Sequence, residues 1–237
     1  MTARLRYIAY LTEKPDTLAE FYRDKFGFAE QARSPAGDIS LSDDAVKLAL
    51  FRARDELGEA RTEIGLHHVG FAVDSIAQVK ARFRRFAPRG VLVPESGKHR
   101  GEVRLHDPEY NPVSLSEKAF DLPGAEGRDS RLTSLAFGAL DPEIMADFYV
   151  RVLGLRPVDA GRTAAAGERG DRAVSDGAVT LAFRDVFAER AGHKPRYGLA
   201  RCGFSPAAAS AGELRDPDGN SIILAKPEAA GGELWRA

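Results

Sequence analysis

Titratable residues recur at every second position in two short segments of the first half of the chain. Glu102, Arg104 and His106 alternate with apolar residues, and His68 begins a run in which small residues alternate with large apolar ones. Because side chains two apart on a β-strand lie on the same face, each set is expected to point one way. Imidazole, carboxylate and guanidinium groups together can transfer protons, hold a divalent ion or bind an anion. The spacing therefore predicts one polar, titratable wall of a binding site.

The elements that must position this wall form an internal repeat. A signature with Phe-Tyr at its start and Gly near its end occurs in residues 21–28 and again in residues 148–155. A second signature, Asp-Pro-x-x-Asn, occurs in residues 107–111 and 216–220, and an alternating apolar run follows each copy. Such ordered repetition indicates duplicated supersecondary units.

Four βαβββ units are predicted from turn signals and hydrophobic periodicity. The first has a strand at 5–11, a helix that begins at Pro15 and ends at Gly27, and strands at 28–33, 38–42 and 45–51. The second has a strand from Leu66, a helix capped by Asp74-Ser75, and strands at 90–93, 102–106 and 112–117. The third begins with a strand at 132–140 and a helix at 141–153. In the fourth, the interval from Arg201 to Asp216 is 24 residues shorter than that from His68 to Asp107, enough to remove the helix and one strand.

The predicted fold class is therefore α+β, with tandem βαβββ units forming two cupped mixed-sheet domains and the last unit truncated. The first domain is expected at residues 1–120 and contains two units. A linker rich in Pro, Gly and acidic residues is expected at 121–130. The second domain is expected at 131–237, with a degenerate second unit.

Composition excludes several classes of function. Among 237 residues, 34 Lys and Arg balance 35 Asp and Glu for a net charge of −1, which gives no long-range attraction to nucleic acid or to an anionic membrane. The single cysteine, Cys202, excludes internal disulfides and thiolate-rich zinc sites, and it fits a reducing compartment. No apolar run approaches membrane-spanning length and no signal peptide is evident, so a cytoplasmic protein is expected.

The ordered signatures resemble the vicinal oxygen chelate superfamily, which includes glyoxalase I, fosfomycin- and bleomycin-resistance proteins, methylmalonyl-CoA epimerase and extradiol dioxygenases. The resemblance covers nearly the whole chain, and its four-unit length is most similar to the extradiol dioxygenases. It implies that paired units form a cup that holds a divalent metal. The fold by itself does not fix the activity, because one scaffold hosts many chemistries.

The resemblance also implies where metal ligands would lie, at the first and last strands of each unit. Carried over by residue, these positions are Tyr7, Leu48, His68 and Ser114 in the first half and Ser134, Leu181, Arg201 and Ile223 in the second. Only His68 is an ordinary ligand for a catalytic divalent ion, which generally needs about three protein ligands. The usual metal site is therefore predicted to be absent, and no cofactor is expected.

Strand alternation predicts which side chains face the cup of the first domain. One parity is expected to pack against the helices: Val69, Phe71, Val103, Leu105, Val113 and Leu115. The other is expected to face the cup: His68, Gly70, Ala72, Glu102, Arg104, His106, Ser114 and Ser116. The first unit is expected to add an apolar wall: Leu5, Tyr7, Ala9, Val46, Leu48 and Leu50. A polar wall opposite an apolar one suits a small amphipathic ligand, with Arg104 as partner for its carboxylate or phosphate.

Three functional hypotheses follow. The first is metal-independent binding of a small amphipathic or acidic molecule, with the ligand-binding set Tyr7, Leu48, Glu102, Arg104, His106 and Ser114. The second is an enzyme, an extradiol-type dioxygenase or a glyoxalase- or epimerase-like lyase, in which His68 is the catalytic residue. In that case His68, Glu102 and His106 form a non-standard site for Fe(II), Mn(II), Ni(II) or Zn(II). The third is a structural or regulatory oligomerisation module, for which a homodimer is the expected state.

Simpler interpretations of the same residues remain open. Glu102 and Arg104 can form an ion pair that closes the cup, and His106 can lie in solvent at the end of its strand. His67 has the opposite parity to His68 and is expected to pack or to bond to the backbone. His99 is expected on a surface loop between two glycines.

Overall fold

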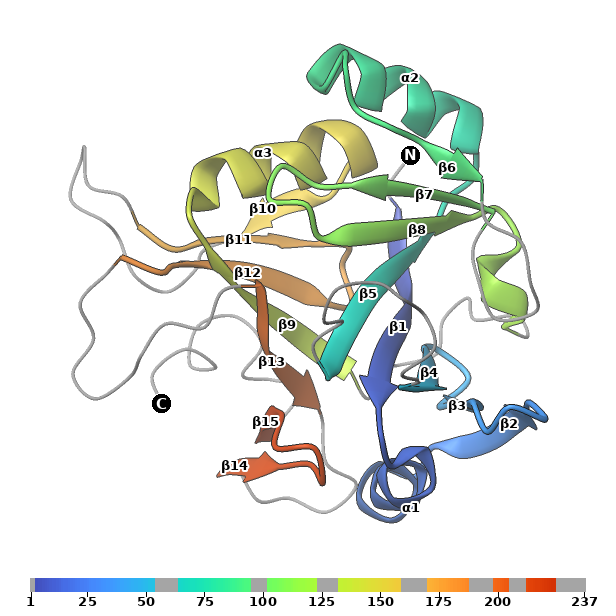
Figure 1. Ribbon diagram of the computed structural model, residues 1–237. Coiled ribbons are helices and arrows are strands. Elements are labelled where there is room, and N and C mark those ends of the chain that lie inside the picture. The colour runs from blue at the N-terminus through green and yellow to red at the C-terminus, as the bar shows by residue number, and fades with distance from the viewer. Residues whose placement is uncertain are drawn as a thin grey trace.

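Two mixed β-sheets, one from each half of the sequence, make up the fold (Figure 1). The computed structural model describes residues 3–53, 64–94, 102–122, 132–158, 170–187, 198–204 and 212–224. Most of the predicted linker, His99 and residues 205–211 of the shortened fourth unit lie outside the described residues. No helix in the described ranges is long and apolar enough to span a membrane.

The first sheet has the strand order β2-β3-β4-β1-β5-β8-β7-β6. Its first unit consists of β1 (Arg4–Thr12), α1 (Pro15–Phe26), β2 (Ala29–Arg33), β3 (Ile39–Ser42) and β4 (Lys47–Arg52). The second consists of β5 (Gly65–Ala72), α2 (Ile76–Phe86), β6 (Val93–Pro94), β7 (Val103–His106) and β8 (Pro112–Ser116). The two units join at the centre of the sheet, where β1 and β5 pair antiparallel.

The second sheet has the order β10-β11-β12-β9-β13-β15-β14. Its complete unit consists of β9 (Leu132–Ala139), α3 (Pro142–Leu153), β10 (Arg156–Val158), β11 (Arg172–Ser175) and β12 (Thr180–Asp185). The fourth unit contributes β13 (Gly198–Phe204), β14 (Gly212–Arg215) and β15 (Ser221–Leu224). The α+β class and the four-unit organisation are confirmed, and the short interval between β13 and β14 accounts for the truncated fourth unit. The domain boundaries stay a prediction.

Helix ends follow the sequence signals. Pro15 begins α1, and Gly27 ends it in the left-handed conformation at φ 68°, where glycine avoids the Cβ clash of other residues. Ser75 caps α2 by accepting a hydrogen bond from the backbone N–H of Gln78. Gly154 ends α3 at φ 75°, in the same way as Gly27.

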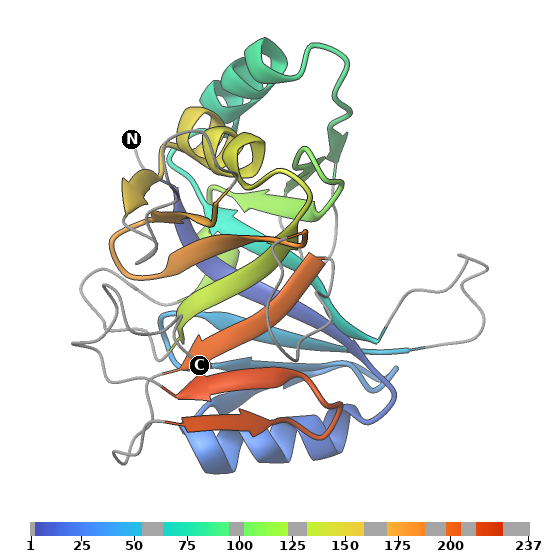
Figure 2. The same ribbon diagram turned by 90° about the vertical axis from the view of Figure 1, so that its left-hand side faces the viewer.

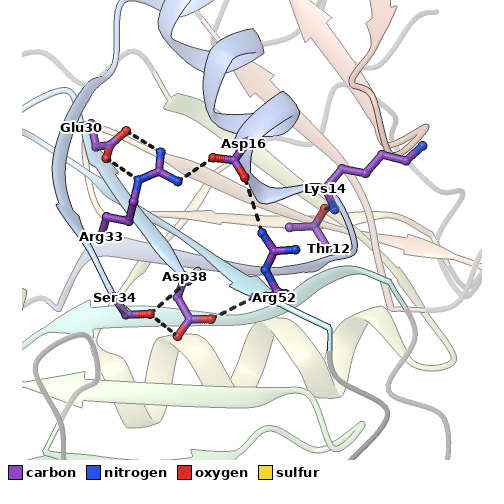
Figure 3. Close-up of polar contacts among 8 residues, drawn as sticks. All are labelled: Thr12, Lys14, Asp16, Glu30, Arg33, Ser34, Asp38 and Arg52. Atoms are coloured by element: carbon purple, nitrogen blue, oxygen red, sulfur yellow. Dashed lines mark hydrogen bonds and ion pairs between the residues drawn. The ribbon is translucent and has the colours of Figure 1, made fainter. Parts of the chain in front are cut away.

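Exposed charges fix the start of α1 against its own sheet (Figure 3). Asp16 accepts a hydrogen bond from Arg33 on β2 at 2.5 Å and one from Arg52 on β4 at 3.4 Å. Arg33 also donates two hydrogen bonds, from Nε and from Nη2, to the carboxylate of Glu30. The hydrogen bond from Arg33 lowers the pKa of Asp16. Because these groups are exposed, the network orients the helix more than it stabilises the fold.

The two recurring signatures meet across the halves. Tyr22 of α1 donates a hydrogen bond to Asp216 in the second half at 3.3 Å, and Tyr149 of α3 donates one to Asp107 in the first half at 3.2 Å. Each tyrosine comes from a Phe-Tyr signature and each aspartate from an Asp-Pro-x-x-Asn turn. Figure 2 shows the resulting exchange, with α1 beside β14 and β15, which lack a helix of their own between β13 and β14 in the described residues.

The main hydrophobic core lies between the sheets and includes residues of both halves. Phe204 of β13 contacts the rings of Tyr22, Phe26 and Phe28 at centroid distances of 5.7, 4.7 and 6.1 Å. Cys202 is buried in the same region, where burial raises the pKa of its thiol to about 12. Cys202 is therefore a core residue and not a reactive thiolate.

Candidate functional site on the cup face of the first sheet

A row of paired residues crosses the first sheet on the side away from the main core, which we call the cup face. Strand register aligns Lys47 with Tyr7, Tyr7 with Gly70, Gly70 with Ser114 and Ser114 with Arg104. Residues paired in neighbouring strands point to the same face of a sheet. The row therefore carries a cation at each end and small or hydroxylated side chains between them.

The middle of this row is filled by an aromatic ring of the chain itself. Phe120 stacks on Tyr7 with ring centroids 4.8 Å apart and an interplanar angle of 16°, and it is only 3% exposed. A Cβ atom at position 70 would lie 2.5 Å from the Phe120 ring and 2.9 Å from Cβ of Tyr7. Glycine at position 70 is thus what lets the ring lie on the sheet.

Phe120 belongs to a short turn with an uncommon backbone, part of residues 117–122, which we call the plug segment. Ala119, Phe120 and Asp121 all adopt left-handed conformations, with φ of 49°, 60° and 59°. Each such residue costs roughly 1–3 kcal/mol when it is not glycine. The side chain of Ser116 accepts hydrogen bonds from the backbone N–H groups of Lys118 and Phe120 at 3.1 and 3.3 Å.

Lys47 ties the plug segment to the cup face. Its ammonium group donates a hydrogen bond to the carbonyl oxygen of Phe120. Lys47 is 7% exposed, and burial lowers its pKa, an effect that the charge of Asp121 partly offsets. An ammonium group in such a site binds an oxygen anion more strongly than one in water does.

Polar groups lie beneath and beside the Phe120 ring. Ser114 is fully buried, and its hydroxyl makes no hydrogen bond with the part of the chain that the structure describes. His68 is 3% exposed, and its Nδ1 lies 2.7 Å from Nδ1 of His67. The His68 ring stacks on Phe51, with centroids 6.4 Å apart. This polar floor suits a ligand with oxygen atoms better than it suits a phenyl ring.

Relief of the left-handed strain gives a direct test of this conformation. Ala119→Gly should raise the free energy of unfolding by about 1 kcal/mol, because glycine adopts positive φ without a Cβ clash and loses only part of that gain to chain entropy. Ala77→Gly, on the exposed side of α2, is the matched control and should lower it by about 0.5–1 kcal/mol. Chemical denaturation measures both; a destabilised Ala119→Gly variant would contradict the left-handed turn.

Several predicted residues lie where alternation placed them. Tyr7, His68, Arg104 and Ser114 share the cup face, and the opposite set packs in the main core as predicted: Val69, Phe71, Leu105, Val113 and Leu115. Glu102 accepts hydrogen bonds from Ser116 Oγ at 3.3 Å and from the backbone N–H of Glu117 at 2.7 Å. Glu102 therefore supports the plug segment.

The orientation predicted for the first unit is wrong in part. Leu48 lies in the main core and not on the cup face, together with Leu5, Val46 and Leu50. The pairing of β1 with β5 is irregular between Leu5 and Tyr7, so the two residues point to opposite faces despite their spacing. In β4, it is Lys47 and Ala49 that share the face of Tyr7.

His106 borders a cavity between α2 and the β7–β8 turn. Burial and the charge of Arg104 lower its pKa. In the described ranges, no three His, Cys, Asp or Glu side chains lie together in a way that could hold a metal ion. The set His68, Glu102 and His106 is therefore not brought together, and the side chains present do not fit the divalent ion that the resemblance implies.

Two residues of this site were missed by sequence reasoning. Lys47 is the single charged residue in the apolar run from Ala45 to Phe51, and that was a usable signal for a buried, functional amine. Phe120 lies beside the predicted linker, and nothing in its local pattern indicated that it would return to the sheet.

The corresponding positions of the second sheet offer less. Leu181 lies in the main core at 1% exposure and cannot face a ligand there. Ser134 is buried next to Gly203, where an added Cβ would come within 2.1 Å of its hydroxyl oxygen. Arg201 and Ile223 lie on adjacent strands that pair in parallel.

Comparisons with known proteins agree with this architecture. Residues 4–108 match the family model described as Glyoxalase/Bleomycin resistance protein/Dioxygenase superfamily. No match is found among curated proteins. Solved structures share the fold over nearly the whole chain. The 2,3-dioxygenase LapB from Pseudomonas sp. KL28 is 15% identical with a TM-score of 0.65, covering 95% of this chain and 94% of its own.

Two further structures extend the comparison. The Mn(II)-bound glyoxalase from Novosphingobium aromaticivorans is 14% identical with a TM-score of 0.69, covering 95% of this chain and 82% of its own. Homoprotocatechuate 2,3-dioxygenase from Arthrobacter globiformis is 17% identical with a TM-score of 0.65, covering 94% and 79%. At these identities the likeness concerns the fold and not the activity. Residues 4–108 are thus similar in sequence to the Glyoxalase/Bleomycin resistance protein/Dioxygenase superfamily, and the chain shares the fold of these solved structures over nearly its whole length.

Proposed function

We propose that the chain is a metal-independent binding protein for a small acidic molecule with an aromatic body, which it binds on the cup face when the plug segment lifts. One observation carries the proposal. Phe120 presents a carbonyl oxygen to Lys47 and a ring to Tyr7, so the chain fills the site with the two groups that an aromatic carboxylate would offer.

The chemistry of the row favours an anion over a neutral molecule. A carboxylate in place of the Phe120 carbonyl would turn a neutral acceptor on Lys47 into a charge-assisted one, which is roughly twice as strong. Ser114 would gain a hydrogen-bond partner for its buried hydroxyl. Arg104, at the far end of the row, would attract the anion or bind a second acidic group.

The energetics of the plug segment make displacement feasible. Stacking on Tyr7 and the bond from Lys47 hold Phe120 in place, while three left-handed residues oppose this at roughly 1–3 kcal/mol each. A ligand that replaces both contacts releases that strain. Its apparent affinity is set by the fraction of molecules in which the segment is open.

Calorimetric titration with 3-phenylpropionate, and with neutral 3-phenylpropanol for comparison, tests the proposal. Phe120→Ala should bind the anion about tenfold more tightly, because the ring that competes for Tyr7 is removed and only the backbone carbonyl still competes for Lys47. Lys47→Met should bind it about 10–100-fold more weakly, since a hydrogen bond to a charged group contributes about 1.5–3 kcal/mol. The alcohol should bind more weakly than the acid to the unmodified protein.

The matched control is Lys25→Met, which removes a cation on the exposed side of α1 and should leave the affinity unchanged. Thermal unfolding verifies that each variant is folded. If Phe120→Ala binds no tighter than the unmodified protein, or if Lys47→Met binds equally well, the proposal is wrong. The enzymatic and oligomerisation hypotheses stay predictions.

A further inference from the structure

A separate cavity of about 810 Å³ lies outside the cup face, between the C-terminal end of α2 and the β7–β8 turn. Its walls include Phe83 and Phe86 of α2 and Phe148 of α3, so residues of both halves enclose it. Its volume is within the range of about 300–1,000 Å³ that is usual for small-molecule sites. Such a cavity exists without any movement of the plug segment.

Tyr110 at the mouth of the cavity is held in an unfavourable conformation. It adopts φ 64°, and the residue is 82% exposed although it lines the cavity. The equivalent turn of the second half, with the same Asp-Pro-x-x-Asn signature, has Gly219 at this position with φ 82°.

Hydrogen bonds within the two turns match. Tyr110 N–H donates to the Asp107 carbonyl at 3.0 Å, and Gly219 N–H donates to the Asp216 carbonyl at 2.8 Å. The second turn therefore shows which residue suits this backbone conformation, since Gly219 adopts positive φ there without steric strain. A tyrosine that costs conformational free energy and gains no burial indicates a role in binding.

The charges around the cavity favour an anion. Arg89 lines it, and Arg84 and Arg85 lie exposed in the last turn of α2. Within the described part of the chain, none of these three arginines makes an ion pair or a hydrogen bond. Unpaired guanidinium groups beside an apolar wall are suited to the head group of an amphipathic anion.

Among the described residues that line the cavity, Asp107 is the only one with a carboxylate, and this carboxylate is already hydrogen-bonded. Asp107 accepts hydrogen bonds from the backbone N–H groups of Glu109 and Asn111, from the Asn111 side chain and from Tyr149. It is 4% exposed and cannot turn toward Arg89 without breaking this turn. His106, whose pKa is lowered by burial, adds a neutral hydrogen-bonding group to the wall.

We propose that this cavity is a second ligand site, specific for an amphipathic monoanion with an alkyl chain. The alkyl chain lies against Phe86 and Val91, over the buried rings of Phe83 and Phe148, the anionic head binds Arg89, and the Tyr110 ring closes over the mouth. The site is distinct from the cup face, because the lining residues Phe83 and Phe148 belong to the main core, whereas Tyr7 and Phe120 form a separate cluster. Because α2 and α3 both line it, an occupied site ties the two halves together and raises the melting temperature.

Titration calorimetry with sodium decanoate and decyltrimethylammonium bromide, each below its micelle concentration, and with decan-1-ol below its solubility limit, tests the proposal. Decanoate should bind with at least about tenfold higher affinity than either other probe. Arg89→Met should weaken decanoate binding by about tenfold or more and leave decan-1-ol binding unchanged. Tyr110→Gly should weaken the binding of decanoate and of decan-1-ol. The same substitution should raise the melting temperature of the free protein, so a failure to fold cannot explain the loss of binding.

Two variants separate this site from the cup face. Lys25→Met removes a cation on α1, away from the cavity, and Lys47→Met removes the cup-face amine; neither should change decanoate binding. Equal affinities for the three probes, unchanged binding by Arg89→Met and Tyr110→Gly, or no decanoate binding at millimolar concentration would each overturn the proposal. Loss of decanoate binding in Lys47→Met would assign the ligand to the cup face and would overturn it as well.

Discussion

Phe204→Ala is expected to lower the free energy of unfolding by about 3–5 kcal/mol, the usual loss when a large buried aromatic side chain is truncated. Phe204 is 1% exposed and contacts three aromatic rings of the first half, Tyr22, Phe26 and Phe28. In the described residues, the fourth unit has no helix between β13 and β14. No helix of that unit can therefore fill the space that the missing ring leaves. The loss should therefore weaken the contact between the two halves as well as the second sheet.

Chemical denaturation followed by far-UV circular dichroism measures this change. The control is Phe187→Ala, at a side chain that is 66% exposed, which should change the free energy by less than about 0.5 kcal/mol. A second, earlier transition in Phe204→Ala would indicate that the second half unfolds first. A loss below about 1 kcal/mol would show that α1 does not cover β13 as described.

The second large effect is a pH dependence of stability that originates at Asp107. Burial raises the pKa of this carboxyl from 3.8 to about 6, against the hydrogen bonds from Asn111, Glu109 and Tyr149, which lower it. In the folded state the proton is therefore held up to about pH 6, whereas the unfolded chain loses it near the ordinary value. The protonated Asp107 carboxyl therefore adds to the free energy of unfolding. This contribution is fully present below the pKa of the carboxyl in the unfolded chain, and it is lost as the pH rises through its pKa in the folded protein.

The expected size is about 3 kcal/mol between about pH 4 and about pH 7, at 1.36 kcal/mol for each unit of the pKa difference. Asp107→Asn cannot ionise and should lack this contribution, so the difference in unfolding free energy between mutant and unmodified protein should change with pH by that amount. Asp216, whose pKa burial also raises, contributes in the same direction and remains in the variant.

Asp24→Asn, on the exposed side of α1, is the matched control and should track the unmodified protein at every pH. Urea titrations at four or five pH values between about 4 and 7 give the required differences. A constant difference between Asp107→Asn and the unmodified protein would show that the hydrogen bonds outweigh burial at this carboxyl.

Alternation predicted the second unit well because its strands are amphipathic. In β5, β7 and β8, polar or small residues such as Arg104 and Ser114 alternate with large apolar ones such as Leu105 and Val113. The sequence pattern therefore identifies which face of each strand packs in the core. In β1 and β4 nearly every residue is buried, including Arg6 and Lys47. A strand covered on both faces carries no polarity signal, and alternation could not distinguish Lys47 from Leu48 there.

The sequence by itself determined the fold class, the four units and the truncation of the last one, because repeated caps, turns and apolar runs are local features. It also indicated that Tyr7, Leu48, His68 and Ser114 make a poor set of metal ligands. Only the tertiary structure decided that Phe120 fills the cup face and that Tyr22 and Tyr149 reach Asp216 and Asp107 in the opposite half. These contacts join residues more than 40 positions apart, and local periodicity contains no information about them. They depend on how two curved sheets and their helices exclude water from a common core.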